Sequence, residues 1–578
     1  MLLAGGAVWG ESGLALRRLV RAWSLFGPLV FEYKVFTWWA RYCSLTDEQK
    51  SMAYRRLHEK YAPLVFSLLA EQGGVFVKIG QLLSLLPEGV LPDQFTKELK
   101  KLQNACPPRE GSEVRRLVSD SLGRPLEEVF SHFEDSPLGS ASIGQVHKAR
   151  VAADGREVVV KVQYPEVSRT VELDFTTCEW VVWFLDKTRV EEVRQTKTYY
   201  IKELDFGMEA ATLHRVHTNL RGPFPAVRVP EPILQLCTPT VLVMTFISGS
   251  SLLDSIMQMA DTIAKARGQT VDQLIAEFTQ SAGAEQAAEA PLDSPSSGWS
   301  ALRSKLAGLV PSLPNGAKVQ LLLRALSVSN AACNTFVALY NGSVARLGAS
   351  PMAPRKALPA FSPTELSYAI WRVHGHQLLV DGIFSTDPHP GNIVVGDGAD
   401  ELGLIDFGQV CELRLETRVT FARLLLALAA EDDMCIARRH ADLGYRTQNM
   451  SMELLALTAR MKYGDASVLR VKAFRQYREL SAADPVLSHA GDEGLGRAER
   501  MINVLRGTSL VLGVPYAHGP TTVWLDMAQA LVSENECLCD PYGDDFYEVL
   551  DEECVFADCC AVLDLSDDSP KTGIHFRQ

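Results

Sequence analysis

The sequence lacks any uninterrupted run of about 18 apolar residues, the minimum that a membrane-spanning helix requires. The best candidate, residues 22–40, carries Glu32 and Lys34 near its middle, and charged groups at that depth oppose insertion. We therefore expect no spanning helix in this stretch. Its aromatic residues, which include Trp38 and Trp39, are compatible with an amphipathic helix at a membrane interface.

Cysteine is also scarce, with 12 residues in a chain of 578, of which seven are scattered between Cys43 and Cys435. Such a low density does not support a secreted scaffold held by disulfides. The other five lie between Cys537 and Cys560 without a C-x-x-C pair, so a structural zinc site is the weaker interpretation. Reduced thiols, and hence a reducing compartment, are the stronger one.

Basic residues are outnumbered, 57 Lys and Arg against 70 Asp and Glu, which leaves a formal net charge of −13. This balance argues against nonspecific binding to a polyanion, so we expect no nucleic-acid partner, although a local basic groove stays compatible with it. The 47% of apolar and 22% of charged residues are ordinary globular proportions. The length excludes a single small binding module.

The first 50 residues have two interpretations. Residues 12–26 contain three arginines and two serines but no acid, which resembles an organellar transit peptide. Glu11 weakens that interpretation, and an ordinary first helix explains the pattern equally well. We assign residues 1–50 to a targeting segment with an amphipathic helix, and residues 51–125 to a helical extension.

Two strand patterns follow the helical extension. The first strand-like stretch comes after Pro137, and an Asp154-Gly155 turn joins two strands into a hairpin. Helical periodicity then returns before a further strand. We expect these elements at Val146–Ala152 and Glu157–Gln163 for the hairpin, at 171–220 for the helices and at Val241–Phe246 for the last strand.

The rest of the chain is predicted to be mostly helical. A long insertion, roughly residues 255–360, contains a linker rich in Ala, Ser, Glu and Pro at 279–298. A second hairpin follows, with strands at Asn392–Val395 and Leu402–Ile405. From Leu413 onward the pattern is helical, and an acidic tail occupies residues 536–578. The predicted bodies are therefore 126–248 and 249–535.

Two segments of the first body suggest phosphate binding. The segment from Gly139 to Val146 reads G-S-A-S-I-G-Q-V, which matches the kinase loop G-x-G-x-x-G-x-V apart from Ala141. Backbone N–H groups of such a loop approach phosphate oxygens, although alone the segment is explained by a plain hairpin turn. We expect nucleotide contacts from Gly139, Ser140, Ala141, Ser142, Ile143, Gly144, Val146 and, on a neighbouring strand, Met244.

The second segment is Val158-Val-Val-Lys161, in which a lysine ends a valine run. In kinases this lysine holds the α- and β-phosphates and pairs with a glutamate on a nearby helix. If Lys161 stood alone, an exposed lysine at a sheet edge would be the better explanation.

Two further segments complete the series. Asp387-Pro-His-Pro-Gly-Asn392 has the D-x-x-x-x-N spacing of a kinase catalytic loop, and Asp406-Phe-Gly408 follows across the second hairpin. Asn392 and Asp406 offer hard oxygen ligands suited to Mg²⁺, and Asp387 is placed to act as a base. His389, between two prolines, is interpreted as a loop-shaping residue. The four segments in this order predict nucleotide chemistry.

Two departures disfavour a conventional protein kinase. No His-Arg precedes Asp387, and no Ala-Pro-Glu follows the D-F-G, where Gln409, Val410 and Cys411 run straight into a helix. The usual activation segment and peptide-docking platform are therefore missing.

With these motifs the sequence resembles the UbiB family of aarF-domain atypical kinases, which includes coenzyme-Q-linked eukaryotic members. Lys78-Ile-Gly-Gln81 matches the family's K-x-G-Q signature, Ala141 its alanine-rich loop, and Glu203-Leu-Asp205 its E-x-D pair. Gly139 and Ser140 depart from the all-alanine loop. The likeness covers roughly residues 50–250 and 362–515.

The resemblance implies roles that the residues alone would not. It makes Glu209 the helix partner of Lys161, and it places Lys78 and Gln81 over the active site, where they block peptide access. Without it, all three are surface residues on polar helix faces. Gly80 in mid-helix costs about 1 kcal/mol relative to alanine, which suggests close packing there.

We therefore expect an α+β, two-lobed, protein-kinase-like fold with a helical N-terminal extension, a long insertion and a mostly helical C-lobe. The expected activity is Mg²⁺-dependent binding of ATP or ADP, with ATP hydrolysis or phosphoryl transfer to a small or lipid-related substrate. The resemblance implies a mitochondrial or plastid role in quinone synthesis or lipid homeostasis. Its partners would be lipid or quinone intermediates, a membrane surface and a biosynthetic protein complex.

Two alternatives remain open on the sequence. A pseudokinase scaffold would bind nucleotide without turning it over, and an autoinhibited protein kinase would need its extension to move away.

Overall fold

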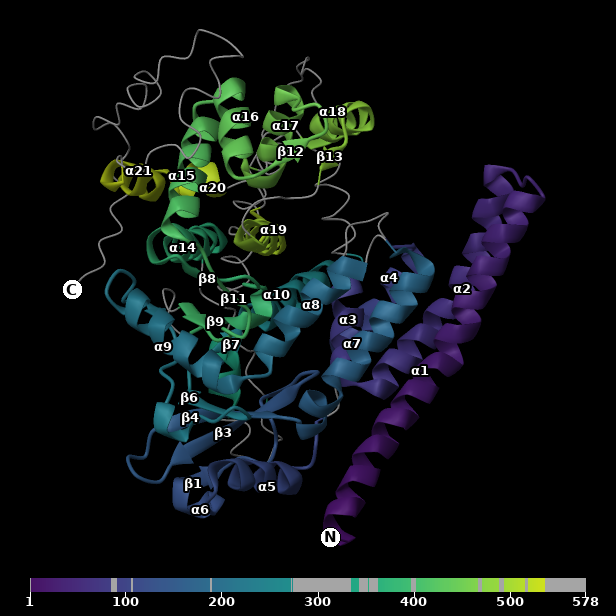
Figure 1. The fold of residues 1–578 in the computed structure, drawn as a ribbon. Helices are drawn as coiled ribbons and strands as arrows, with labels where there is room; N and C mark the ends of the chain where they lie inside the picture. The colour runs from purple at the N-terminus through teal and green to yellow at the C-terminus, as the bar shows by residue number, and fades with distance from the viewer. Residues whose placement is uncertain are drawn as a thin grey trace. The chain divides into compact units, whose positions relative to one another are not determined.

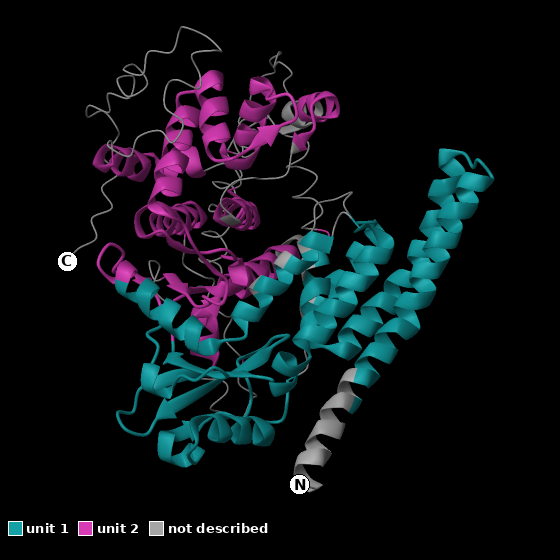
Figure 2. Cartoon of the chain, viewed as in Figure 1, with its two compact units in different colours: residues 1–218, 230–246 teal, residues 219–229, 247–578 magenta. Residues whose placement is uncertain are grey.

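The computed structural model describes most of the chain before residue 536. The described residues are 2–84, 91–104, 108–187, 190–271, 273, 334–341, 352, 362–396, 402–465, 470–487, 493–514 and 518–535. The predicted linker at 279–298, the late cysteines and the acidic tail lie outside them. The chain forms two compact units (Figure 2), unit 1 with Met1–Thr218 and Pro230–Phe246, unit 2 with Asn219–Val229 and Ile247–Gln578. The division at 246/247 falls beside the predicted boundary at 248/249.

Unit 1 contains a five-stranded antiparallel sheet, formed by strands between Phe130 and Thr245 (Figure 1). The predicted hairpin is present, and Gly155 adopts a φ of +73° in its turn, which glycine tolerates best. One expectation was wrong, because a strand at Phe130–Phe133 precedes Pro137 and pairs with the strand Gly144–Val151. The strands are β1 (Phe130–Phe133), β2 (Gly139–Ser140), β3 (Gly144–Val151), β4 (Glu157–Gln163) and β6 (Val241–Thr245).

One face of this sheet is covered by α5 (Gly111–Leu122) and α6 (Leu126–Val129), as Figure 1 shows. Alternate residues of β4 point into this core, because successive side chains of a strand face opposite ways. Val158 and Val160 pack there against Val114 of α5 and are fully buried. The other face of the sheet therefore carries the intervening residues of each strand.

Helical residues between 22 and 102 share a second core of unit 1 with the helix at 165–185, and this core is built on apolar residues at three- and four-residue spacing. Thr46 begins α2 with a reciprocal capping box to Gln49. Besides α5 and α6, the helices of unit 1 are α1 (Leu2–Tyr42), α2 (Asp47–Gln72), α3 (Gly74–Ser84), α4 (Asp93–Leu99), the 3-10 turn η1 (Lys100–Asn104), α7 (Pro165–Leu185), α8 (Val190–Glu203) and α9 (Phe206–Arg221), with a 3-10 turn η3 (Leu234–Leu236) later in the unit.

The first helix is part of the folded unit from Arg18 onward. Arg18 donates to both carboxylate oxygens of Asp174 on α7 at 3.1 and 2.6 Å, and Phe26 and Leu29 are buried in the helical core. Residues 18–40 thus behave as an ordinary packed helix. No helix within the described ranges combines the length and hydropathy needed to span a bilayer.

Unit 2 contains short strands among many helices. A four-stranded sheet has the order β5-β10-β9-β7, with β10 parallel to β5, and two-stranded ladders join β11 to β8 and β12 to β13. The strands are β5 (Val227–Arg228), β7 (Ser250–Ser251), β8 (Ile383–Ser385), β9 (Ile393–Val395), β10 (Leu402–Leu404), β11 (Val410–Glu412), β12 (Arg446–Thr447) and β13 (Val486–Leu487).

The sequence predicted that the chain after the D-F-G segment runs straight into a helix, and this prediction was wrong. Residues Val410–Glu412 form β11, which pairs with β8 before α15 begins. The helices of unit 2 are α10 (Leu252–Arg267), α14 (Pro363–His376), the π-helix η5 (Gln377–Asp381), the 3-10 turn η6 (Pro390–Asn392), α15 (Leu415–Ala429), α16 (Asp433–Asp442), α17 (Met452–Tyr463), α18 (Arg470–Ala483), α19 (Glu493–Val511), α20 (Pro520–Val523) and α21 (Leu525–Glu534). Within the predicted insertion, residues 334–341 are also helical.

The core of unit 2 is anchored by two fully buried tryptophans. The rings of Trp371 and Trp524 lie 5.5 Å apart, and Trp524 Nε1 donates to the Trp371 carbonyl at 2.7 Å. Gly375, one turn further along α14, leaves the space that the Trp524 ring fills, since a Cβ there would lie 2.3 Å from Trp524 Cδ1. This packing fixes α14, which leads through η5 and β8 to the predicted catalytic loop.

Candidate functional site

Lys161 and Glu209 form the ion pair that the resemblance implied. Lys161, on β4, donates from Nζ to both carboxylate oxygens of Glu209 at 2.8 and 2.9 Å. Both side chains are largely buried, and the Lys161 ammonium lies 4.9 Å from the ring centroid of Phe206. A buried pair with two charge-assisted bonds holds the ammonium in a fixed place.

The E-x-D segment positions Glu209 by capping its helix. Asp205 Oδ1 accepts hydrogen bonds from the N–H groups of Gly207 and Met208 at 2.9 and 3.1 Å, which satisfies the free donors at the start of α9. Gln163, at the end of β4, donates to the Leu204 carbonyl at 2.7 Å. The strand that carries Lys161 and the helix that carries Glu209 are therefore tied by the same short segment.

The other acid of this segment, Glu203, pairs with the K-x-G-Q lysine. Lys78 Nζ lies 3.5 Å from Glu203 Oε2, and both side chains are mostly buried. Gln81 instead donates to the Leu102 carbonyl at 3.0 Å, inside the extension. Close packing at Gly80 is present, because a Cβ there would lie 2.2 Å from Leu102 Cδ1.

The predicted phosphate loop is a tight turn between β2 and β3. Ala141 N donates to the Gly144 carbonyl at 2.8 Å, and the Tyr164 N–H donates to the Ile143 carbonyl at 2.9 Å. Gly144 is required by space, since a Cβ there would lie 2.2 Å from the Val162 carbonyl oxygen. Ile143 packs against the cluster around Tyr164, so it anchors the loop.

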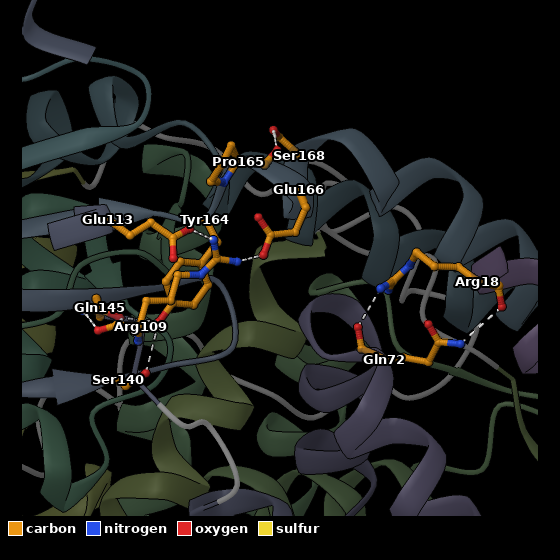
Figure 3. Close-up of polar contacts among 10 residues, drawn as sticks. All are labelled: Arg18, Gln72, Arg109, Glu113, Ser140, Gln145, Tyr164, Pro165, Glu166 and Ser168. Atoms are coloured by element: carbon orange, nitrogen blue, oxygen red, sulfur yellow. Dashed lines mark hydrogen bonds and ion pairs between the residues drawn. The ribbon is translucent and has the colours of Figure 1, made fainter. Parts of the chain in front are cut away.

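A polar network beneath the loop was not predicted (Figure 3). Gln145 Oε1 accepts from the Tyr164 hydroxyl and the Arg109 N–H, both at 2.8 Å, and the Arg109 guanidinium lies 4.3 Å from the Tyr164 ring centroid. Arg109 also pairs with Glu113 at 2.6 Å and with Glu166. The sequence offered one signal for this network: Gln145 and His147 are polar residues on the face of β3 that points into the core.

Strand register places three predicted nucleotide contacts on one face of the sheet. Val146 pairs with Lys161, and Met244 pairs with Val159, two residues before Lys161 on β4. Because strand side chains alternate, Val146, Lys161 and Met244 share the face opposite the valine core. Met244 is buried there.

In unit 2, the hairpin of β9 and β10 brings the third and fourth motifs together. Ile405 N donates to the Asn392 carbonyl at 3.1 Å, so Asp406 follows directly beside Asn392. Asn392 Nδ2 donates to the Asp387 carbonyl at 3.3 Å. His389 accepts from the Gly391 N–H at Nδ1, at 3.0 Å, which is the loop-shaping role expected of it.

The donor set fits Mg²⁺ better than a metal that needs a full protein cage. Within the described ranges, no group of three or more His, Cys, Asp or Glu side chains could hold a metal ion. An amide oxygen from Asn392 and a carboxylate from Asp406 leave the other positions to phosphates and water, as Mg²⁺ prefers. A bound Mg²⁺ would supply charge neutralisation at nucleotide phosphates.

A buried acid lies at the end of the π-helix that precedes β8. Burial raises the pKa of the Asp381 carboxyl to about 6, although Arg418 and Asn219 oppose the shift. His376 Nε2 lies 3.6 Å away, and burial lowers the pKa of that imidazole. Arg418 donates to the carbonyls of Leu379 and Val380 and so clamps the same turn.

Replacing Asp381 with asparagine should remove a pH-dependent cost. The folded pKa lies above the unfolded one, so the folded state holds the proton longer, and this carboxyl destabilises the fold as pH rises from about 4 to about 6. We expect the stability of the wild type to fall by about 2 kcal/mol relative to Asp381→Asn over this range. Urea unfolding of both proteins at several pH values measures it, and a constant difference would contradict the assignment.

The antiparallel sheet with its lysine–glutamate pair and the hairpin with its Asn and Asp define a kinase-like α+β fold. Residues 101–286 and 350–440 match the ABC1 atypical kinase-like domain. The chain therefore carries this atypical kinase-like domain, and the resemblance to the UbiB family is confirmed. The match is interrupted inside the predicted insertion.

Curated relatives carry names of the same kind. The chain is 36% identical over 204 residues to AarF domain-containing protein kinase 1 of Mus musculus, covering 34% of this chain and 38% of the relative. It is 32% identical over 254 residues to the probable protein kinase UbiB of Pseudomonas aeruginosa, covering 42% and 47%. The matched part thus spans less than half the length of either relative.

Among solved structures, the Rv3197–erythromycin complex from Mycobacterium tuberculosis has a TM-score of 0.39 and 21% identity, covering 84% of this chain and 98% of that one.

Proposed function

We propose that this protein binds a Mg²⁺-nucleotide, ATP or ADP, and hydrolyses ATP or transfers its phosphoryl group to a small or lipid-related acceptor. The observation that carries the proposal is the buried Lys161–Glu209 pair, on the sheet face that also holds Val146 and Met244. Such a pair fixes an ammonium for phosphate oxygens, which is what phosphoryl transfer needs from a protein.

Each unit supplies its own part of this chemistry. In unit 1, the backbone from Gly139 to Gly144 and the ammonium of Lys161 would hold phosphates. In unit 2, Asn392 and Asp406 would hold Mg²⁺, and Asp387, two residues beyond β8, would accept the proton of an attacking hydroxyl or water. Lys78 and Gln81 would limit access for a peptide.

The biological setting is proposed from the family. The resemblance to the UbiB proteins supports a role in quinone biosynthesis or organellar lipid homeostasis, in a mitochondrion or a plastid. The proposed partners are lipid or quinone intermediates, a membrane surface and a biosynthetic protein complex.

Asp406→Asn tests the metal assignment. We expect this change to abolish the rise in melting temperature that Mg²⁺-ATP or Mg²⁺-ADP produces in the wild type, because an amide cannot supply the charge that Mg²⁺ requires. Asp261→Asn is the control, since Asp261 pairs with Lys265 on the exposed side of α10. An unchanged nucleotide effect in Asp406→Asn would show that Asp406 is not the ligand.

Release of phosphate separates catalysis from scaffolding. Under single-turnover conditions with labelled ATP, the wild type should form ADP, whereas a pseudokinase would form no product at any protein concentration. Nucleotide binding without product would therefore retain the binding site and overturn the enzymatic part of the proposal.

A further inference from the structure

The side of α1 that faces away from its packing partners is strongly apolar. Ala22, Phe26 and Leu29 bury one side of the helix. The opposite side carries four exposed residues at spacings of four, three and four, which one helical face requires. These are Phe31, Val35, Trp38 and Tyr42, with exposed fractions of 68%, 45%, 67% and 79%.

On this part of α1 the cations outnumber the acids. Lys34 and Arg41 flank this face of the helix and are exposed. Glu32 is the one acid in the sequence between residues 13 and 42, and it is held by Lys60 of α2 at 2.5 Å. The outward side of α1 from Phe31 to Tyr42 therefore combines aromatic and cationic groups without a carboxylate.

A second helix continues the surface. Near the end of α7, Trp180, Trp183 and Phe184 are exposed at the spacing of one helical face, and the Lys187 ammonium lies 4.5 Å from the Trp183 ring centroid. Two contacts join this end of α7 to α1. The rings of Phe184 and Trp23 meet edge to face at 6.0 Å, and Lys34 donates to the Leu185 carbonyl at 3.1 Å.

We propose that these exposed residues, from Phe31 to Tyr42 on α1 and from Trp180 to Lys187 on α7, form a surface that docks on an anionic phospholipid bilayer. We call it the α1/α7 surface. Tryptophan and tyrosine favour the headgroup level of a bilayer, where the ring is apolar and its polar edge stays wet. Lys34, Arg41 and Lys187 are attracted by anionic lipids, and they outnumber the exposed Asp186, the one acid between Trp180 and Lys187.

The composition favours lipid over a protein partner. Lysine is depleted at protein interfaces but common on the polar flank of interfacial helices. A bilayer also accepts a convex helical surface, because its headgroups rearrange around it. The inference gives a location to the membrane contact proposed above and rests on that part of the proposal, but it does not depend on the nucleotide chemistry.

Vesicle binding by the full chain tests the proposal. We expect the wild type to sediment with vesicles of equal parts phosphatidylcholine and phosphatidylglycerol, and to do so less in high salt. Trp38→Ser with Tyr42→Ser should weaken this binding about tenfold, since two rings no longer enter the interface. Leu510→Ser with Val511→Ser is the matched control, because both residues are exposed on α19 of unit 2.

A second pair of substitutions tests the electrostatic part. Lys34→Gln with Arg41→Gln should weaken binding to the anionic vesicles by roughly fivefold for each cation removed, with no effect on vesicles of phosphatidylcholine alone. The proposal is overturned if the wild type binds no vesicles, or if the two serines change nothing. The proposal is also overturned if the wild type self-associates and the only effect of the two serine substitutions is to make it a monomer. The α1/α7 surface would then be an interface between copies of the chain.

Nucleotide-induced thermal stabilisation should be unchanged in all of these variants, because none of them touches the predicted nucleotide residues. A failure of the docking proposal is thereby separated from a failure of the nucleotide proposal. Since the side chains replaced by serine are exposed, the melting temperature of the serine variants without ligand should also stay that of the wild type.

Discussion

Glu209→Ala should lower the free energy of unfolding of unit 1 by about 3–5 kcal/mol, the usual cost of breaking a buried ion pair by removing one partner. The Glu209 carboxylate is almost fully buried, and Lys161 loses both of its short bonds to it. The contact with the Phe206 ring, at 4.9 Å, replaces only a small part of this attraction. Urea unfolding measures the change.

Two further variants separate stability from function. Glu209→Gln keeps a hydrogen-bond acceptor of the same shape and should cost less than the alanine. Lys161→Met combined with Glu209→Leu replaces the pair by apolar side chains and should restore most of the stability. The double variant should nevertheless fail to bind Mg²⁺-ATP. A double variant that binds nucleotide normally would show that the pair has only a structural role.

Trp524→Ala should destabilise unit 2 by about 3–5 kcal/mol, the usual cost of emptying a fully buried aromatic site. The ring is completely buried, stacks obliquely on Trp371 and donates a hydrogen bond to it. Hydrogen exchange should show lost protection in α14, while the amides of β3 and β4 in unit 1 keep theirs. Equal loss in both units would contradict a local role.

Gly375 provides the matched test of this packing. In the wild type, Gly375→Ala should cost about 1–3 kcal/mol, because the added Cβ overlaps the Trp524 ring. In the Trp524→Ala background, the same substitution should cost much less, since the methyl group then enters the space the ring has left. A double-mutant cycle measures this difference, and simple additivity would argue against direct contact.

The sequence could predict those elements whose partners lie nearby. The β3–β4 hairpin follows from two strand-like segments on either side of Asp154-Gly155, a pair of residues that favours a turn. Strand β1 escaped prediction because Phe130 and Phe133 are its buried positions, with two exposed residues between them, which is no strand alternation. Strand β11 was not predicted because it has only three residues, too few to show a periodicity. It forms by pairing with β8, some 25 residues earlier.

The candidate site was predictable in part, and for different reasons. The spacing of Asn392 and Asp406 around a hairpin already implied their juxtaposition. The pairing of Lys161 with Glu209 needed the family resemblance, because 48 residues separate them. No pattern could tell that Asp205 caps a helix while Glu203, two residues earlier, reaches Lys78. The Arg109–Gln145–Tyr164 network depends on tertiary packing, and the only sign of it in the sequence is the presence of polar residues at buried strand positions.

The distribution of these contacts has a consequence for assembly of the fold. The Lys161–Glu209 pair closes entirely within unit 1, and the hairpin that holds Asn392 and Asp406 closes entirely within unit 2. Asn392 and Asp406 are only fourteen positions apart in the sequence, so the hairpin forms with little loss of chain entropy, whereas the ion pair must wait for β4 and α9 to meet. Each part can thus reach its native geometry during folding independently of the other.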